Sequence, residues 1–325
     1  MKLPDIIEQK IEEKIANIKL NDLKQISNNL SNKYMKEERK GQALLSKDIE
    51  AISYSIIRMP ATYCAVKMVL RQSLEYFSEC NSYIDVGAGT GAASLAIIED
   101  LNIEKGLCIE REEAMQNLGK ELLDCVQNKE NIDWISLDIE KKNINKKADL
   151  VITSYMLNEI RKENRLNIVK KLLDITNKIL IIIEPGTPEG FNNIRKIQEY
   201  AVENNIKIIA PCVGNFKCTL PNNDWCHTTV RIERNKIHKY LKNGDAPYED
   251  EKFSYIVLSK INNSNKLENT NERRILRHPI IEKGKITLKT CHDGMIEEVG
   301  ITKKQKELFK IAKKIKCGEV INGEF

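Results

Sequence analysis

The sequence predicts an α/β protein whose core is a mostly parallel sheet covered by helices on both faces. Three observations predict this fold. From Asn81 onward, short and nearly continuous apolar runs alternate with helical segments, as parallel strands buried on both faces require. A glycine-rich loop directly follows the first apolar run. A polar stretch, residues 262–271, then separates this pattern from a smaller last segment.

Residues 1–80 are expected to form an N-terminal helical region ahead of the sheet. Their isoleucines recur at three- and four-residue spacing, which places them on one helix face: Ile7, Ile11, Ile15 and Ile18. Ser46 is a candidate N-cap for a further helix. Pro60 is expected to separate that helix from the next one, residues 61–77, because proline removes a backbone donor from a helix interior.

Residues 81–261 are expected to form the core, a seven-stranded sheet. The predicted strands are residues 83–86, 106–110, 132–137, 149–153, 179–184, 206–210 and 253–258. The last of these runs follows a long insertion that carries cysteines, about residues 210–252. A strand that arrives so late along the chain suits an antiparallel position in the sheet.

Residues 262–325 are expected to form a small C-terminal module that contains β-structure. An Asp-Gly pair, Asp293 and Gly294, lies between two apolar runs and predicts a β-hairpin turn. A lysine-rich helix is expected over about residues 303–316, where seven lysines and one glutamate give a net charge of +6. This surplus exceeds the +5 of the whole chain and favours either contact with phosphates or a solvated helix face.

The composition excludes several classes of protein. Hydrophobic residues make up 41% of the 325 residues, enough for a sizeable core, which excludes a wholly disordered chain. No run approaches eighteen consecutive apolar residues, so no membrane span is expected. The N-terminal stretch is unlike a signal or transit peptide, and we therefore expect a cytoplasmic protein. In that reducing compartment nine cysteines argue against a disulfide framework, so the thiols must be buried, catalytic or metal-bound.

The glycine-rich loop, residues 84–91 (IDVGAGTG), ends the first predicted strand and begins a helix. Glycine is needed where the backbone turns tightly and approaches a ligand without a Cβ in the way. Together with Ala92 the loop matches the G-x-G-x-x-A dinucleotide pattern, in which a helix N-terminus holds a pyrophosphate. Together with Asp85 it matches D-x-G-x-G-x-G, which resembles motif I of class I S-adenosylmethionine (SAM)-dependent methyltransferases. The glycines alone leave both cofactors open.

Acidic residues at two later strand ends favour SAM. Glu110 ends the second predicted strand and could accept hydrogen bonds from both ribose hydroxyls, a role that both kinds of site use. Asp138 ends the third strand, where class I methyltransferases place an acidic or polar residue against the adenine amino group. The predicted cofactor-binding residues are Asp85, Gly87, Gly89, Gly91, Glu110, Asp138, Ser154 and Asn158.

No catalytic residue is predicted. Methyl transfer is an in-line displacement, so an enzyme mostly positions the acceptor and sometimes removes its proton. Such groups come from the end of the fourth strand, here residues 154–159 (SYMLNE), which lack the Asn/Asp-Pro-Pro-aromatic motif of amino-group methyltransferases. Asn158 and Glu159 are candidates for contacts with cofactor or acceptor, and packing at a helix start is the alternative interpretation.

Three cysteines of the insertion lie close together with the spacing C-x5-C-x7-C: Cys212, Cys218 and Cys226. Cys291, beside the Asp-Gly turn, is a possible fourth ligand. Thiolates select zinc, copper or iron–sulfur clusters. Zinc ribbons prefer C-x2-C pairs, which are absent here, so the irregular spacing favours a cubane [4Fe–4S] cluster, with zinc as the alternative. On spacing alone, a coincidental cluster of cysteines without metal stays open.

The other cysteines have simpler interpretations. Cys64, Cys80, Cys108 and Cys125 lie in helical or strand patterns and are expected to be buried small hydrophobic residues. Cys317, near the C-terminus, is left open between a free surface thiol and a packing residue.

Several segments together resemble the mitochondrial ribosomal small-subunit assembly family that includes methyltransferase-like protein seventeen, with its bacterial and archaeal relatives. The matching segments are residues 58–63 (RMPATY), 85–91 (DVGAGTG), 154–159 (SYMLNE), 184–188 (EPGTP), 210–212 (APC), 224–227 (DWCH), 248–255 (YEDEKFSY) and 290–294 (TCHDG). The resemblance runs from about residue 45 to residue 300. The glycine loop is generic, whereas the segments at 210–212, 224–227 and 248–255 are much more specific.

The resemblance implies a Rossmann-like class I methyltransferase fold that binds SAM, joined to an iron–sulfur site with the ligands Cys212, Cys218, Cys226 and Cys291. It also implies that the protein acts on the small ribosomal subunit and its ribosomal RNA during assembly or translation. Because methylation is unsettled within this family, a non-catalytic SAM-binding assembly factor is the alternative function, and a small-molecule methyltransferase is a third. We expect a monomer without a membrane partner.

Overall fold

The computed structural model describes residues 1–34, 47–101, 103, 105–126, 131–212, 215–261 and 272–322. The chain divides into two compact units. The first unit comprises Met1–Ile183 and Val230–Glu251, and the second comprises Glu184–Thr229 and Lys252–Phe325. The three-region organisation expected from the sequence, with boundaries near residues 80 and 261, stays a prediction.

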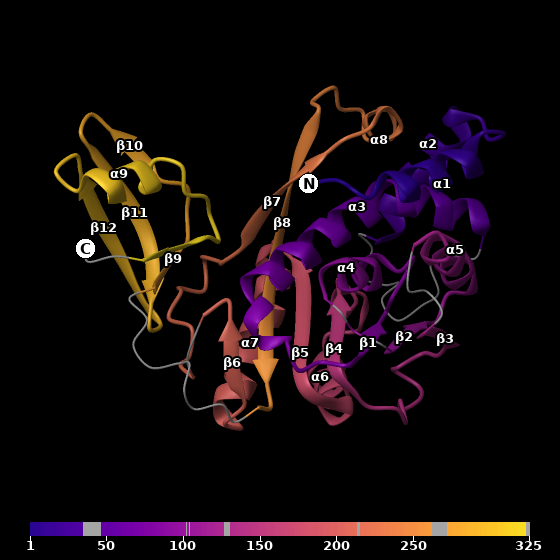
Figure 1. The fold of residues 1–325 in the computed structure, drawn as a ribbon, viewed down its shortest axis with the longest axis horizontal. Helices are drawn as coiled ribbons and strands as arrows, with labels where there is room; N and C mark the ends of the chain where they lie inside the picture. Colours follow the sequence, from indigo (N-terminus) through magenta and orange to yellow (C-terminus); the bar gives the residue numbers. More distant parts are fainter. Residues whose placement is uncertain are drawn as a thin grey trace. The chain divides into compact units, whose positions relative to one another are not determined.

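An eight-stranded sheet follows the order β3-β2-β1-β4-β5-β8-β6, with β7 paired to β8 (Figure 1). Its strands are β1 (Ser82–Val86), β2 (Lys105–Glu110), β3 (Ile132–Ser136), β4 (Ala148–Ser154), β5 (Thr176–Pro185), β6 (Lys207–Ala210), β7 (Thr228–Glu233) and β8 (Tyr248–Ser259). Strands β1 to β5 pair in parallel, and β6 pairs antiparallel with β8. The predicted class I methyltransferase fold is confirmed, including the late antiparallel strand.

The burial of the strands explains why their sequences predict them so well. Residues Ile179 to Ile183 of β5 are all 0% exposed, which is the reason for their unbroken apolar run. Strand β7 has no counterpart among the predicted strands. Only Val230 and Ile232 of its residues are apolar and buried, so its short alternating pattern is weak.

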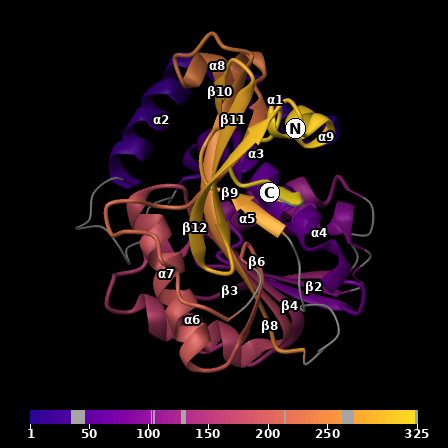
Figure 2. The same ribbon diagram turned by 90° about the vertical axis from the view of Figure 1, so that its left-hand side faces the viewer.

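The helices of the first unit are α1 (Asp5–Ile15), α2 (Leu20–Tyr34), α3 (Asp48–Gln72), α4 (Ala92–Asp100), α5 (Glu113–Leu123), α6 (Arg165–Ile175) and α8 (Lys236–Leu241). Helix α3 contacts α1, α2, α4, α5 and α8, so the N-terminal helices form one layer with those that follow β1 and β2. Figure 2 shows α6 on the side of the strands opposite to α4. The predicted N-terminal helical region is therefore present.

Pro60 does not break the helix, contrary to the prediction. Helix α3 continues through it from Asp48 to Gln72. A proline in a helix interior costs about 3 kcal/mol. Its neighbours Met59 and Ala61 are 1% and 0% exposed, so the burial of both sides of this long helix outweighs the lost hydrogen bond. The candidate cap Ser46 lies outside the described residues, and Lys47 occupies the N-cap position.

The second unit contains α7 (Pro188–Glu203), which packs against β6, and an antiparallel module. The module consists of β9 (Glu272–Ile275), β10 (Ile280–Glu282), β11 (Lys285–His292), β12 (Met295–Thr302), α9 (Lys306–Ala312) and β13 (Val320–Asn322). Its core is formed by Ile275, Ile286, Leu288, Ile301, Ala312, Ile315 and Ile321. The polar stretch at 262–271 lies outside the described residues.

The predicted hairpin is confirmed. Strand β11 pairs with β12 along its whole length, from Lys285 opposite Thr302 to His292 opposite Met295. Asp293 and Gly294 in the turn have φ angles of 47° and 77°, as a tight two-residue hairpin turn requires. The predicted lysine-rich helix is shorter than residues 303–316, because α9 ends at Ala312, the last helical residue that packs on the module core.

None of the helices in the described ranges is both long and apolar enough to cross a lipid bilayer.

Candidate cofactor pocket and cysteine site

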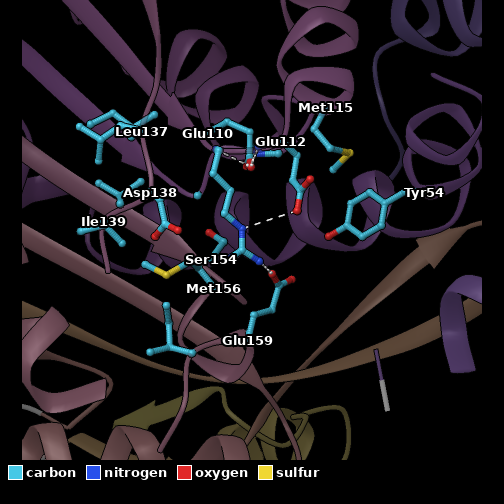
Figure 3. Close-up of a pocket in the computed structure, with 16 residues that line it drawn as sticks. Tyr54, Glu110, Glu112, Met115, Leu137, Asp138, Ile139, Ser154, Met156 and Glu159 are labelled. Carbon is cyan, nitrogen blue, oxygen red and sulfur yellow. Dashed lines mark hydrogen bonds and ion pairs between the residues drawn. The ribbon is translucent and has the colours of Figure 1, made fainter. Parts of the chain in front are cut away.

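A pocket of the first unit lies where β1, β2, β3 and β4 end. It is lined by Tyr54, Val86, Gly87, Gly89, Ile109, Glu110, Arg111, Glu112, Met115, Leu137, Asp138, Ile139, Ser154, Met156, Glu159 and Ile160. Figure 3 shows four labelled acids, Glu110, Glu112, Asp138 and Glu159, around it. The carboxyl edge of a parallel sheet is where such folds bind ligands. Five of the eight predicted cofactor residues line this pocket: Gly87, Gly89, Glu110, Asp138 and Ser154.

The glycines of the loop are dictated by backbone geometry. Gly87, Gly89 and Gly91 have φ angles of +73°, +56° and +80°, which side chains rarely adopt. A Cβ on Gly87 would lie 2.7 Å from Met156 Cγ, inside the pocket wall. Gly91 occupies the N-cap position of α4, outside the pocket lining. The loop can therefore pass close to a ligand only while it keeps these glycines.

The Glu110 carboxylate holds the glycine loop against the loop that follows β2. Its Oε2 accepts a hydrogen bond from the Gly89 N–H at 2.8 Å. Its Oε1 accepts from the N–H groups of Arg111 at 2.8 Å and Glu112 at 2.9 Å. Burial raises the pKa of Glu110, whereas these three donors oppose the rise. A carboxylate has about four acceptor positions, so one remains for a ribose hydroxyl.

Asp85 lies behind the loop and does not line the pocket. It is 1% exposed, and its Oδ2 accepts hydrogen bonds from Ser94 Oγ at 2.9 Å and Ser94 N–H at 3.2 Å. It therefore ties β1 to α4. Burial raises the pKa of Asp85 to about 7. Asn158 also lies outside the lining, and its carbonyl accepts from Arg165 Nη2 at 3.2 Å.

Ser154 and Asp138 contribute polar groups to the pocket. Ser154 lines the pocket, and within the described part of the chain its Oγ is buried without a hydrogen-bond partner. Asp138 Oδ1 accepts from the Glu140 N–H at 3.0 Å, and its Oδ2 lies 3.2 Å from Lys141 Nζ. These contacts fix the Asp138 side chain at the end of the third strand.

The lining residues that the sequence does not predict include Tyr54, Arg111, Glu112 and Met115. Arg111 and Glu112 directly follow a predicted strand end, a position that could have identified them. Tyr54 comes from α3, far along the chain from the glycine loop, and no motif marks it.

The pocket is acidic. Four carboxyl groups face one guanidinium, that of Arg111, whose Nε lies 3.6 Å from Glu112 Oε1 and whose Nη2 lies 3.9 Å from Glu159 Oε2 (Figure 3). A surplus of carboxylates attracts a cation and repels a pyrophosphate. The pocket therefore suits a positively charged cofactor better than a dinucleotide.

The second unit brings together the four predicted cysteine ligands, which line one pocket: Cys212, Cys218, Cys226 and Cys291. Cys212 follows β6, Cys218 and Cys226 precede β7, and Cys291 lies on β11. Much of the remaining wall is apolar, including Phe191, Leu220 and Leu276. Among the residues that the structure describes, no three His, Cys, Asp or Glu side chains surround one point closely enough to hold a single metal ion.

Cys64, Cys80 and Cys108 are buried, as expected. Cys125 follows the end of α5 and is only half-buried, so the expectation that it is buried is wrong. Cys317, whose role the sequence leaves open, is 1% exposed, and its Sγ donates to the carbonyls of Leu276 at 3.2 Å and His227 at 3.3 Å. It is a buried packing residue.

The family model described as mitochondrial small ribosomal subunit Rsm22 matches residues 48–322 of the chain, which confirms the resemblance to a small-subunit family. The mitochondrial description does not fit the cytoplasmic location expected from the sequence. No curated protein matches the chain.

Several solved methyltransferase structures are similar to the chain. A proposed RNA methyltransferase from Pyrococcus horikoshii shares 19% identity, with 63% of this chain and 87% of that chain covered and a TM-score of 0.42. Magnesium protoporphyrin IX methyltransferase from Synechocystis PCC 6803, with bound SAM, shares 13% identity, with coverages of 71% and 91% and a TM-score of 0.42. Because both TM-scores are below 0.5, these similarities carry no argument about the fold. The fold assignment rests on the strand order and the family match.

The buried Asp85 makes stability depend on pH. Its pKa is about 7 in the folded state and about 4 in the unfolded chain, so the folded state keeps a proton that the unfolded state loses. The contribution of Asp85 to the free energy of unfolding is therefore fully present below pH 4. It is lost as the pH rises through 7, and the loss is at most about 4 kcal/mol. Asp85→Asn should remove this decline. Urea unfolding without cofactor at pH 5 and pH 8 measures it.

The control is Asp133→Asn, because Asp133 is exposed on β3. It should keep the wild-type pH dependence. An Asp85→Asn variant with the same decline as wild type would contradict this assignment.

Proposed function

Because the chain belongs to the family described as mitochondrial small ribosomal subunit Rsm22, we propose that it is a SAM-dependent methyltransferase-like protein that acts on the small ribosomal subunit and its RNA during assembly. The observation that carries the SAM part is the acidic pocket at the carboxyl ends of β1 to β4. The ribosomal part rests on the family. A monomeric chain without a membrane partner completes the proposal.

The chemistry of the pocket supports SAM. The cofactor carries a sulfonium and an ammonium group against a single carboxylate, so the surplus of carboxyl groups attracts it. Glu110 keeps an acceptor position for a ribose hydroxyl, and Asp138, which lines the same pocket, would accept a hydrogen bond from the adenine amino group. A dinucleotide would meet the same acids with its pyrophosphate. The Gly89 N–H, which could otherwise bind phosphate, already donates to Glu110.

Bound SAM would supply an electrophilic methyl group, and the residues of this chain would position it and exclude water. The segment after β4 offers no amino-group methyltransferase motif, and Met156 from this segment packs against Gly87. The missing motif favours the second candidate, an assembly factor that binds SAM without transferring its methyl group.

Labelled SAM incubated with immature small subunits separates the candidates. Label in ribosomal RNA supports the enzyme, and tight subunit binding without label supports the assembly factor. Label found only in small molecules would contradict both and favour a small-molecule methyltransferase.

The four cysteines are proposed to hold an iron–sulfur cluster, with zinc as the alternative. The donor set fits, because four soft thiols line one pocket together with apolar side chains such as Phe191 and Leu220. Zinc in a four-thiolate site has its sulfurs about 2.3 Å from the ion. A cubane takes one thiolate at each of its iron corners, so it tolerates wider spacing.

The basic C-terminal module is proposed to contact ribosomal RNA. Residues 272–322 contain thirteen Lys and Arg against seven Asp and Glu, a net charge of +6, whereas the whole chain has +5. The Lys303 N–H donates to the Gly284 carbonyl at 3.2 Å, which joins two turns into one lysine patch. This patch consists of the exposed residues Lys283, Lys285, Lys303, Lys304 and Lys306.

We expect Gly87→Ala to abolish SAM binding or weaken it more than tenfold. The new Cβ would both strain a backbone with a φ of +73° and displace Met156. Isothermal titration with SAM measures the effect. Gly284→Ala is the matched control, since its φ is +90° but nothing lies within 4 Å of the added Cβ. Wild-type affinity in Gly87→Ala would refute the pocket assignment.

Protein purified anaerobically should contain about four iron atoms per chain and absorb broadly in the visible range. Cys218→Ala should lose most of the iron, because one iron corner loses its thiolate. Cys125→Ala, in the first unit, should keep it. Stoichiometric zinc without iron would contradict the iron–sulfur assignment.

Changing Lys283, Lys303 and Lys304 together to glutamate should weaken binding to small subunits and reduce the dependence on salt. If each lysine neutralises one phosphate, the slope of log affinity against log salt should fall by about two to three. The control triple, Lys19, Lys146 and Lys147 to glutamate, changes exposed lysines of the first unit by the same charge. Equal weakening by both triples would contradict a specific role for the module.

A further inference from the structure

Arg274 on β9 is a buried cation whose hydrogen-bond partners are all neutral. Arg274 is 5% exposed. Its Nε donates to the Pro211 carbonyl at 2.9 Å and its Nη2 to Tyr255 Oη at 3.0 Å. Its Nη1 donates to the Gly318 carbonyl at 2.8 Å and lies 3.4 Å from Thr228 Oγ1. Among the described residues, no carboxylate forms an ion pair with it.

Such an arrangement is costly without a negative charge nearby. A guanidinium cannot be deprotonated in a protein, and burying an unpaired charge costs several kcal/mol. Hydrogen bonds to neutral oxygens satisfy the N–H groups but leave the charge itself uncompensated. The second unit must therefore place negative charge close to Arg274.

The cysteines are the groups that can provide this charge. Arg274 lines the same pocket as the four thiols. In the pairing of β9 with β11 it lies directly opposite Cys291. A second guanidinium reaches the site as well, because Arg195 Nη2 lies 3.9 Å from Cys218 Sγ.

We propose that Arg274 is the counter-charge of an anionic metal–thiolate centre formed by the four cysteines, and that it couples occupancy of this centre to the anchoring of the C-terminal module. The inference rests on the metal site proposed above. Four thiolates leave a net negative charge on the centre whether it holds zinc or a cubane cluster. Arg274 and Cys291 belong to the module, whereas Pro211, Thr228 and Tyr255 belong to the segments before it.

The coupling works in both directions. When the centre is formed, its charge stabilises the buried guanidinium, whose fork then joins β9 to the loop after β6, to β7 and to β8. When the metal is lost, the guanidinium loses its counter-charge and the module is held less firmly. If the centre is a redox-active cluster, Arg274 also favours the reduced form, which carries one more negative charge, and so raises the reduction potential.

Metal content and thermal stability of three variants test this proposal. Arg274→Met removes the charge, and Arg274→Lys keeps the charge but loses the planar fork. Arg273→Met is the matched control, because Arg273 is the neighbouring residue of β9 and pairs with Glu297. Metal per chain is measured after anaerobic purification, and the unfolding temperature is measured before and after chelation.

We expect Arg274→Met to hold less than half of the wild-type metal and to show a much smaller drop in unfolding temperature on chelation. Arg274→Lys should keep most of the metal, and Arg273→Met should behave as wild type. If the metal is iron, the reduction potential of the metal-bound fraction of Arg274→Met should be more negative than that of wild type. Full metal content with an unchanged chelation effect in Arg274→Met would overturn the proposal.

Three further outcomes keep the proposal separate from the metal site on which it rests. If Arg274→Met does not fold, the metal content of Arg274→Lys is the test. This variant keeps the charge, so a loss of metal as complete as in Cys218→Ala would refute a role for the charge. Zinc in wild type would refute the iron–sulfur assignment alone, since the chelation comparison applies equally to zinc. A wild-type protein that binds neither metal would refute both.

Discussion

The proposed cofactor pocket depends on the hydrogen bonds that the Glu110 carboxylate accepts from the backbone. The carboxylate accepts three backbone N–H groups, one from the glycine loop and two from the turn after β2. These bonds hold two strand ends in one fixed relation, and the glycine loop can comply only because its glycines adopt positive φ angles. Burial disfavours the charge on Glu110, so the three donors also keep an anion where the cofactor would bind.

The second unit also buries a charge, and there the charge is positive. There a buried cation, Arg274, bonds to four neutral oxygens and lines a pocket with four thiols. Both sites therefore rely on buried charges whose compensation is incomplete within the described residues. At the cofactor pocket the missing partner would be cationic, and at the cysteine site it would be anionic. Bound SAM and a metal–thiolate centre have these charges.

The sequence predicts the parts that periodicity and motif spacing determine. All seven expected strands are present. The parallel strand β5 has the unbroken apolar run that burial on both faces requires, and the Asp-Gly pair identifies the hairpin. Cys212, Cys218, Cys226 and Cys291 line one pocket, and their role as metal ligands stays a prediction. Each of these features leaves a local signature in the chain.

Features that depend on distant packing have no such signature. Pro60 should end a helix by its own chemistry, but burial along α3 outweighs it. Tyr54 reaches the pocket only because α3 packs beside the sheet, and Arg274 is informative only once its burial is known. Asp85 belongs to a recognised motif, yet its side chain is turned toward Ser94 rather than the pocket. A motif fixes residue types, whereas the fold decides which way they face.

Calorimetric titration of the wild-type protein with SAM and, separately, with NAD⁺ tests the central claim most directly. An acidic pocket that keeps one acceptor on Glu110 should bind SAM saturably at one site per chain and show no measurable heat with NAD⁺. Saturable binding of NAD⁺ without binding of SAM would contradict the account.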